Sequence, residues 1–104
     1  MYDRAAAESR TRELLDVLAA ADGALTPDEV AARMRPGSEG SRVSRGSVRA
    51  AIRNARRIEK RLREGGQLDR EVLIVDYSAY ATEGANRYTL GAEDKVALLR
   101  ENSG

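Results

Sequence analysis

A row of basic side chains in the middle of the sequence is the feature best suited to do chemistry. Residues 42–63 contain nine Arg or Lys and one acidic residue, Glu59. On a helix with roughly 100° per residue, five of these cations would share one sector about 80° wide. They recur at spacings of three or four residues and are Arg45, Arg49, Arg53, Arg56 and Lys60. A helix face of this kind binds anions, and the phosphates of nucleic acid are the first candidates.

The rest of the chain is acidic, so the net charge of +1 hides a strong asymmetry. Residues 1–41 hold five Arg against eight Asp or Glu, and residues 64–104 hold four basic against eight acidic residues. A solvated helix would interleave Glu at i+4 spacing with its cations, whereas residues 42–63 offer only Glu59. We therefore favour nucleic acid as the partner. An acidic protein surface and a plain solvated face are the alternatives.

Composition excludes several kinds of catalytic and metal chemistry. The chain has no Cys and no His, which rules out disulfides, thiolate or imidazole metal sites and Ser-His or Cys-His nucleophiles. Asp69, Glu71 and Asp76 cluster near a predicted strand, but no further ligand or base is expected beside them. No Gly-rich phosphate loop has the required spacing. We predict that the protein is not an enzyme and uses no cofactor, metal or small-molecule ligand.

The basic row requires a helix, and the same segment carries an apolar stripe on its other side. The stripe predicts a helix over residues 44–64. Ser44 or Ser41 is the expected N-cap, and Gly65-Gly66 is the expected end. Such a helix would be ~30 Å long at about 1.5 Å per residue. The stripe consists of Val48, Ile52, Ala55, Ile58 and Leu62.

Two helices are predicted before this segment, and a hairpin and a helix after it. The first helix runs from Arg4 or Ser9 to Ala21. The second follows Thr26, which can act as N-cap before Pro27 and form a capping box with Glu29. Residues 71–77 and 87–90 are strand candidates around a loop at 78–86, and residues 93–101 form a closing helix. We expect one domain over residues 1–104, mainly α with a small β-hairpin.

Two segments resemble bacterial winged helix-turn-helix DNA-binding proteins. Residues 25–31 (LTPDEVA) are similar to the second helix of such regulators, and residues 43–52 (VSRGSVRAAI) to the opening of their recognition helix. The resemblance implies a three-helix core, a two-stranded wing and a short C-terminal helix. In this chain the link between the second and third helices is longer than the usual tight turn. The third helix also extends about one turn beyond the common length.

The resemblance places Ser44, Arg45, Ser47 and Arg49 where such helices meet DNA. The N-terminal part of a recognition helix enters the major groove, so Arg45, Ser47 and Arg49 are candidates for base contacts. Asn54 is expected to point away from the cationic row.

The remaining predicted DNA contacts are to phosphates or from the segments beside the helix. Phosphate contacts give affinity and salt dependence without sequence information. We assign them to Arg53, Arg56, Arg57 and Lys60. Arg42, just before the helix, and Arg87, the only basic residue of the hairpin, complete the predicted site.

The expected function is sequence-dependent binding of double-stranded DNA by a bacterial transcriptional regulator. No apolar run approaches the roughly 20 residues that span a bilayer, and the first residues lack a secretory layout, so we expect a cytoplasmic protein without a membrane partner. One alternative is a winged-helix module that docks an acidic protein. Another is a DNA-binding factor for plasmid or phage replication, partition or excision. Both faces of residues 71–77 are apolar, which leaves a homodimer open.

Overall fold

The computed structural model describes residues 4–35, 43–76, 87–91 and 93–102. In these residues it contains four helices: α1 (Arg4–Ala20), α2 (Pro27–Arg33), α3 (Arg45–Glu64) and α5 (Glu93–Glu101). The strands β1 (Leu73–Asp76) and β2 (Arg87–Leu90) form an antiparallel sheet. The described chain is mainly helical with a small two-stranded sheet, as predicted. The predicted loop at 78–86 lies outside the described residues.

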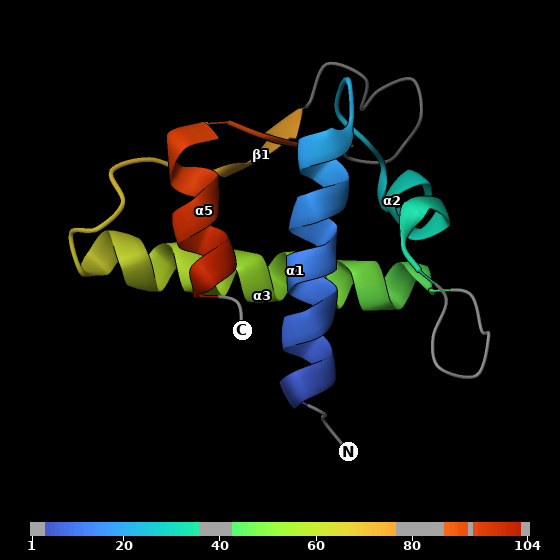
Figure 1. The fold of residues 1–104 in the computed structure, drawn as a ribbon, viewed down its shortest axis with the longest axis horizontal. Helices are drawn as coiled ribbons and strands as arrows, with labels where there is room; N and C mark the ends of the chain where they lie inside the picture. The colour runs from blue at the N-terminus through green and yellow to red at the C-terminus, as the bar shows by residue number, and fades with distance from the viewer. Residues whose placement is uncertain (1–3, 36–42, 77–86, 92, 103–104) are drawn as a thin grey trace.

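Helix α3 is the element against which the other helices pack (Figure 1). Helix α1 crosses it near its middle, α2 lies near its N-terminal end, and α5 lies over its C-terminal half. The predicted stripe of α3 is buried along its whole length, with Val48 and Ala55 fully inaccessible. This burial is what directs the opposite side of α3 toward solvent.

The core has two parts that meet along α1 and α3. The first packs the N-terminal half of α3 against α1 and α2, and includes Leu14, Val30 and Val48. The second packs the C-terminal half of α3 against α5, and includes Leu15, Ile58 and Leu99. Because Leu14 and Leu15 enter different clusters, α1 contributes to both.

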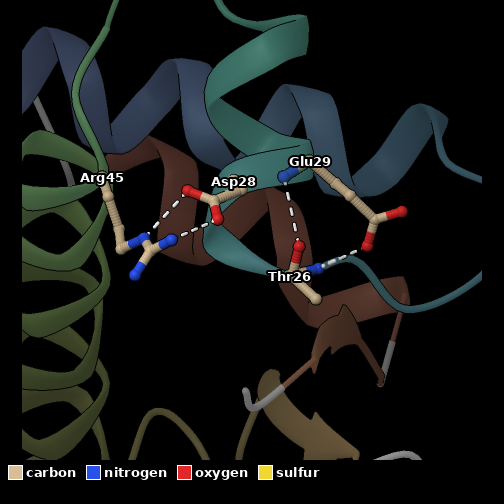
Figure 2. A network of polar contacts seen from close by, with 4 residues as sticks. All are labelled: Thr26, Asp28, Glu29 and Arg45. Atoms are coloured by element: carbon tan, nitrogen blue, oxygen red, sulfur yellow. Dashed lines mark hydrogen bonds and ion pairs between the residues drawn. The ribbon is translucent and has the colours of Figure 1, made fainter. Parts of the chain in front are cut away.

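The starts of α2 and α3 are fixed by the caps that the sequence predicts. The Thr26 hydroxyl accepts from the Glu29 N–H at 3.2 Å, and the Thr26 N–H donates to Glu29 Oε1 at 2.9 Å (Figure 2). These two bonds form a capping box, with Pro27 at the first helical position. Ser44 caps α3 by accepting from the Ser47 N–H at 3.1 Å. The alternative cap, Ser41, lies outside the described residues.

The end of α3 is a glycine-dependent turn. Gly66 adopts φ +76°, a left-handed conformation that favours glycine. The Gln67 N–H donates to the Leu62 carbonyl at 2.9 Å, and the Gly66 N–H to the Arg63 carbonyl at 3.1 Å. This pair of bonds is a Schellman motif, which satisfies the last carbonyls of the helix. The predicted end at Gly65-Gly66 is confirmed.

Strand β2 bonds to the chain on both of its edges. On one side it pairs with β1, with Leu73 opposite Leu90 and Val75 opposite Tyr88. On the other side Tyr88 exchanges two backbone bonds with Leu25, at 2.7 and 2.8 Å. The link between α1 and α2 is therefore joined to the two-stranded sheet by a single bridge at Leu25.

A buried carboxylate connects α3 to the start of the sheet. Glu59 is only 3% exposed, and its Oε2 accepts the N–H groups of Val72 and Leu73 at 2.6 and 3.1 Å. Val72 and Leu73 are themselves fully buried, so water does not replace this acceptor without rearrangement. Glu59 therefore satisfies two main-chain donors that the sheet leaves open.

Removing this acceptor is expected to destabilise the fold. Glu59→Ala leaves two buried N–H groups without a partner, which is expected to lower the free energy of unfolding by about 2–4 kcal/mol. Glu59→Gln keeps a side-chain oxygen that can accept both bonds and should lose about 1 kcal/mol or less. Urea denaturation followed by circular dichroism measures the difference. Equal stability of Glu59→Ala and the wild type would show that other groups satisfy these amides.

Glu59 also predicts a pH dependence of stability. Burial raises the pKa of Glu59 above its ordinary value, and the amide donors of Leu73 and Val72 only partly offset this effect. The folded state thus binds this proton more tightly than the unfolded chain. Its contribution to the free energy of unfolding decreases as pH rises from the ordinary glutamate pKa through the raised folded value.

The comparison that isolates this effect is wild type against Glu59→Gln over a pH series. We expect the stability difference, wild type minus variant, to decrease across that window and to level off above it. Urea titrations at each pH give the difference directly. A difference that increases with pH would mean that the amide donors dominate and the folded pKa is lowered.

Candidate nucleic-acid interface

The exposed side of α3 carries four cations, which we name the basic face: Arg49, Arg53, Arg56 and Lys60. All are exposed except Arg56, which is half-buried. Within the described residues none of the four side chains forms a hydrogen bond or close ion pair. Two lie near carboxylates, since Arg49 helps to lower the pKa of Asp28 and Arg56 opposes the rise in the pKa of Glu59. The basic face is therefore positioned by the helix and open to an anion.

The predicted serines lie at the N-terminal end of α3. Ser44 and Ser47 are both exposed, and the Ser44 hydroxyl lies 3.1 Å from the Ser47 hydroxyl. The Ser44 oxygen also caps α3, so part of its hydrogen-bonding capacity is used inside the protein. Ser47 is the freer of the two hydroxyls to meet a ligand.

Arg45 forms a bidentate pair with Asp28 at the start of α2 (Figure 2). Its Nε donates to Asp28 Oδ1 at 2.8 Å and its Nη2 to Oδ2 at 2.5 Å. Both side chains are more than half exposed, at 57% for Arg45 and 62% for Asp28. The hydrogen bond from Arg45 is the largest cause that lowers the pKa of Asp28, so the carboxylate stays charged at neutral pH. The pair joins the first turns of α2 and α3.

Arg57 is exposed beside the basic face, but its side chain is hydrogen-bonded on its own helix. Its Nη2 donates to Asn54 Oδ1 at 2.6 Å, and Asn54 Nδ2 donates to the Thr11 hydroxyl at 2.8 Å. Thr11 is fully buried and Asn54 nearly so. Asn54 therefore links α3 to α1 and does not lie among the cations, as the sequence predicted.

Arg87 is turned toward the start of α2. Its side chain is 23% exposed, and Nη1 donates to Glu29 Oε1 at 3.1 Å and to the Ala24 carbonyl at 3.4 Å. Glu29 is the same residue that closes the capping box of α2. The structure thus gives Arg87 a role in holding β2 against α2. Arg42, the other flanking cation, lies outside the described residues.

Sequence reasoning missed two contacts of α3. One is the pair of Arg45 with Asp28, and the other is the bond of Glu59, within α3, to the start of β1. Glu59 carried one usable signal, because it is the single acidic residue among residues 42–63 and borders the buried stripe. Asp28 carried no signal for its partner, since Arg45 lies 17 residues further along the chain. Its position in the first turn of α2 indicated only a favourable interaction with the helix dipole.

The described residues also bear on metal binding and membrane insertion. No group of three or more His, Cys, Asp or Glu side chains there is placed to hold a metal ion. No described helix is long and apolar enough to cross a membrane. The basic face is the strongest charged feature of the part of the chain that the structure describes.

The contacts of Arg87 predict a structural role for this side chain. Arg87→Ala removes the bonds to Glu29 and Ala24 and is expected to lower the free energy of unfolding by about 1–2 kcal/mol. Arg70→Ala is the matched control, because its pair with Asp69 is exposed at 67% and 68% and should change stability by less than about 0.5 kcal/mol. Thermal unfolding followed by circular dichroism compares the two. Equal melting temperatures would contradict the role given to Arg87.

Comparison with family models, with curated proteins and with solved structures finds no match for this chain. The charge and geometry of its own residues carry the assignment of function.

Proposed function

We propose that this protein binds double-stranded DNA by laying the basic face of α3 along the duplex. The observation that carries the proposal is the row of four cations on α3 whose side chains have no close partner within the described residues. A helix of 20 residues is ~30 Å long, comparable to one turn of duplex. Phosphates on one side of the DNA can therefore meet cations along most of the helix.

The arrangement around α3 supports a winged helix-turn-helix. Three helices precede a two-stranded hairpin, and the link between α1 and α2 pairs with the second strand of that hairpin. Helix α2 packs at the N-terminal end of α3, as the first helix of a helix-turn-helix does beside its recognition helix. In this reading α3 is the recognition helix and its first turns enter the major groove.

The side chains of α3 then divide into two groups. Those near its start, Arg45, Ser47 and Arg49, face base edges, where an Arg bound to guanine is the commonest specific contact. Arg53, Arg56 and Lys60 bind phosphates. Arg57 and Arg87 contribute less, because each donates hydrogen bonds inside the protein. We further propose that the protein acts in the cytoplasm as a transcriptional regulator, by occupying its site on DNA.

Salt dependence of duplex binding tests this proposal. We expect log affinity to decrease linearly with log salt, with a slope of about −0.9 for each phosphate that the protein neutralises. Arg53→Ala should reduce the magnitude of that slope by roughly one and weaken binding to all sequences alike. Fluorescence anisotropy of a labelled duplex over a salt series measures both quantities.

A matched control lies on the same helix. Arg61 is exposed but sits on another side of α3, so Arg61→Ala removes the same charge without touching the basic face. Its slope should stay close to that of the wild type. If Arg61→Ala and Arg53→Ala have equal effects, net charge and not the basic face determines binding. If the wild type does not bind duplex at about 50 mM salt, where phosphate contacts are strong, the DNA proposal fails. Acidic protein surfaces would then be the partners to test.

A further inference from the structure

We propose that Asp28 is a positioning residue that holds Arg45 so that the free edge of its guanidinium recognises a guanine. The inference rests on the proposed function, since it assigns a role within the same DNA-binding surface. It begins from the pair in Figure 2, in which both oxygens of Asp28 accept from Nε and Nη2 of Arg45.

The donors of Arg45 show what the pair leaves open. A guanidinium carries five N–H donors in one plane, and Asp28 occupies the edge formed by Nε and Nη2. The other edge, formed by Nη1 and the second N–H of Nη2, remains a planar fork. In Figure 2 the third guanidinium nitrogen points away from Asp28. Guanine offers the matching acceptors, O6 and N7, in the major groove.

The support behind Asp28 is rigid. Asp28 lies in the first turn of α2, between Pro27 and the capping-box residue Glu29. Val30, two residues further on, is fully buried in the core. The carboxylate is thus fixed by a capped and packed helix, and it restricts an Arg side chain that is otherwise 57% exposed. A side chain ordered before binding loses less conformational freedom when it binds.

Because Asp28 is negatively charged, its positioning role can be distinguished from simple electrostatic attraction to DNA. A carboxylate beside the basic face repels phosphates, and it partly neutralises Arg45. It therefore lowers affinity for any duplex while it orients one donor edge. Removal of the Asp28 carboxylate should therefore decrease sequence preference. It should not decrease the affinity for unrelated duplex, which stays equal or increases.

The experiment first selects the preferred duplex of the full-length wild type from a random-sequence library. Competition titrations then measure the preference for each base at each position. Arg45→Ala is expected to lower the preference for guanine at one position by about 5- to 150-fold. Asp28→Ala should lower the preference at that same position by a similar factor, and the double variant should lose nothing further. Circular dichroism verifies that each variant is folded, and Asp28→Asn, which keeps the side-chain volume, replaces Asp28→Ala if the latter unfolds.

Asp22→Ala is the matched control, because it removes the charge of another exposed aspartate, one that lies before α2. It should leave the preference at every position unchanged. The proposal is overturned if Asp28→Ala strengthens binding to all duplexes with the same base preference, or if Arg45→Ala leaves the guanine preference intact. If the wild type does not bind duplex at all, this is seen in the first titration, before any variant is made. That result overturns the proposed function itself and this inference with it.

Discussion

Burial of the apolar stripe of α3 is the constraint on which the rest of the structure depends. Helix α1, helix α2, helix α5 and strand β1 all cover that stripe, either directly or through the two core clusters. Once the stripe is covered, the rotation of α3 about its axis is fixed. The cations spaced three and four residues apart then come to the surface as one row. Mutual repulsion within the row is tolerated because burial of the stripe stabilises the helix independently of the charges.

Contacts within the protein reduce the number of cations that are available to a partner. Arg45, Arg57 and Arg87 each donate to an oxygen of another side chain. In the part of the chain that the structure describes, Arg49, Arg53, Arg56 and Lys60 form no such bond. Fewer cations are therefore open to a partner than the composition of residues 42–63 indicates. Its cations also differ in their contacts: Arg45 is paired with Asp28, whereas no described residue bonds to the side chains of the basic face. On the proposed function, Arg45 would make selective contacts with DNA and the basic face would provide general attraction to it.

The sequence predicts those features that depend on neighbours three or four residues away. The capping box of Thr26 and Glu29, the Ser44 cap, the buried stripe and the glycine end of α3 are all local patterns, and the structure confirms each of them. The contacts of Asp28, Glu59 and Arg87 are not local, because their partners lie 17, 13 and 58 residues away. They form only after the helices and the sheet have docked, so no periodicity in the sequence encodes them. As a result, the position of the basic face could be predicted and the internal partners of its flanking arginines could not.

The pairing of Leu25 with Tyr88 affects how the chain folds during its synthesis. Arg87, the neighbour of Tyr88, also contacts Ala24 across a separation of 63 residues. The link between α1 and α2 therefore pairs with β2 only after most of the chain has been synthesised. Until β2 has left the ribosome, Leu25 in that link and Leu73 in β1 lack contacts that bury them in the finished fold. Contacts of such long range slow folding and leave apolar surface open to other chains in the meantime.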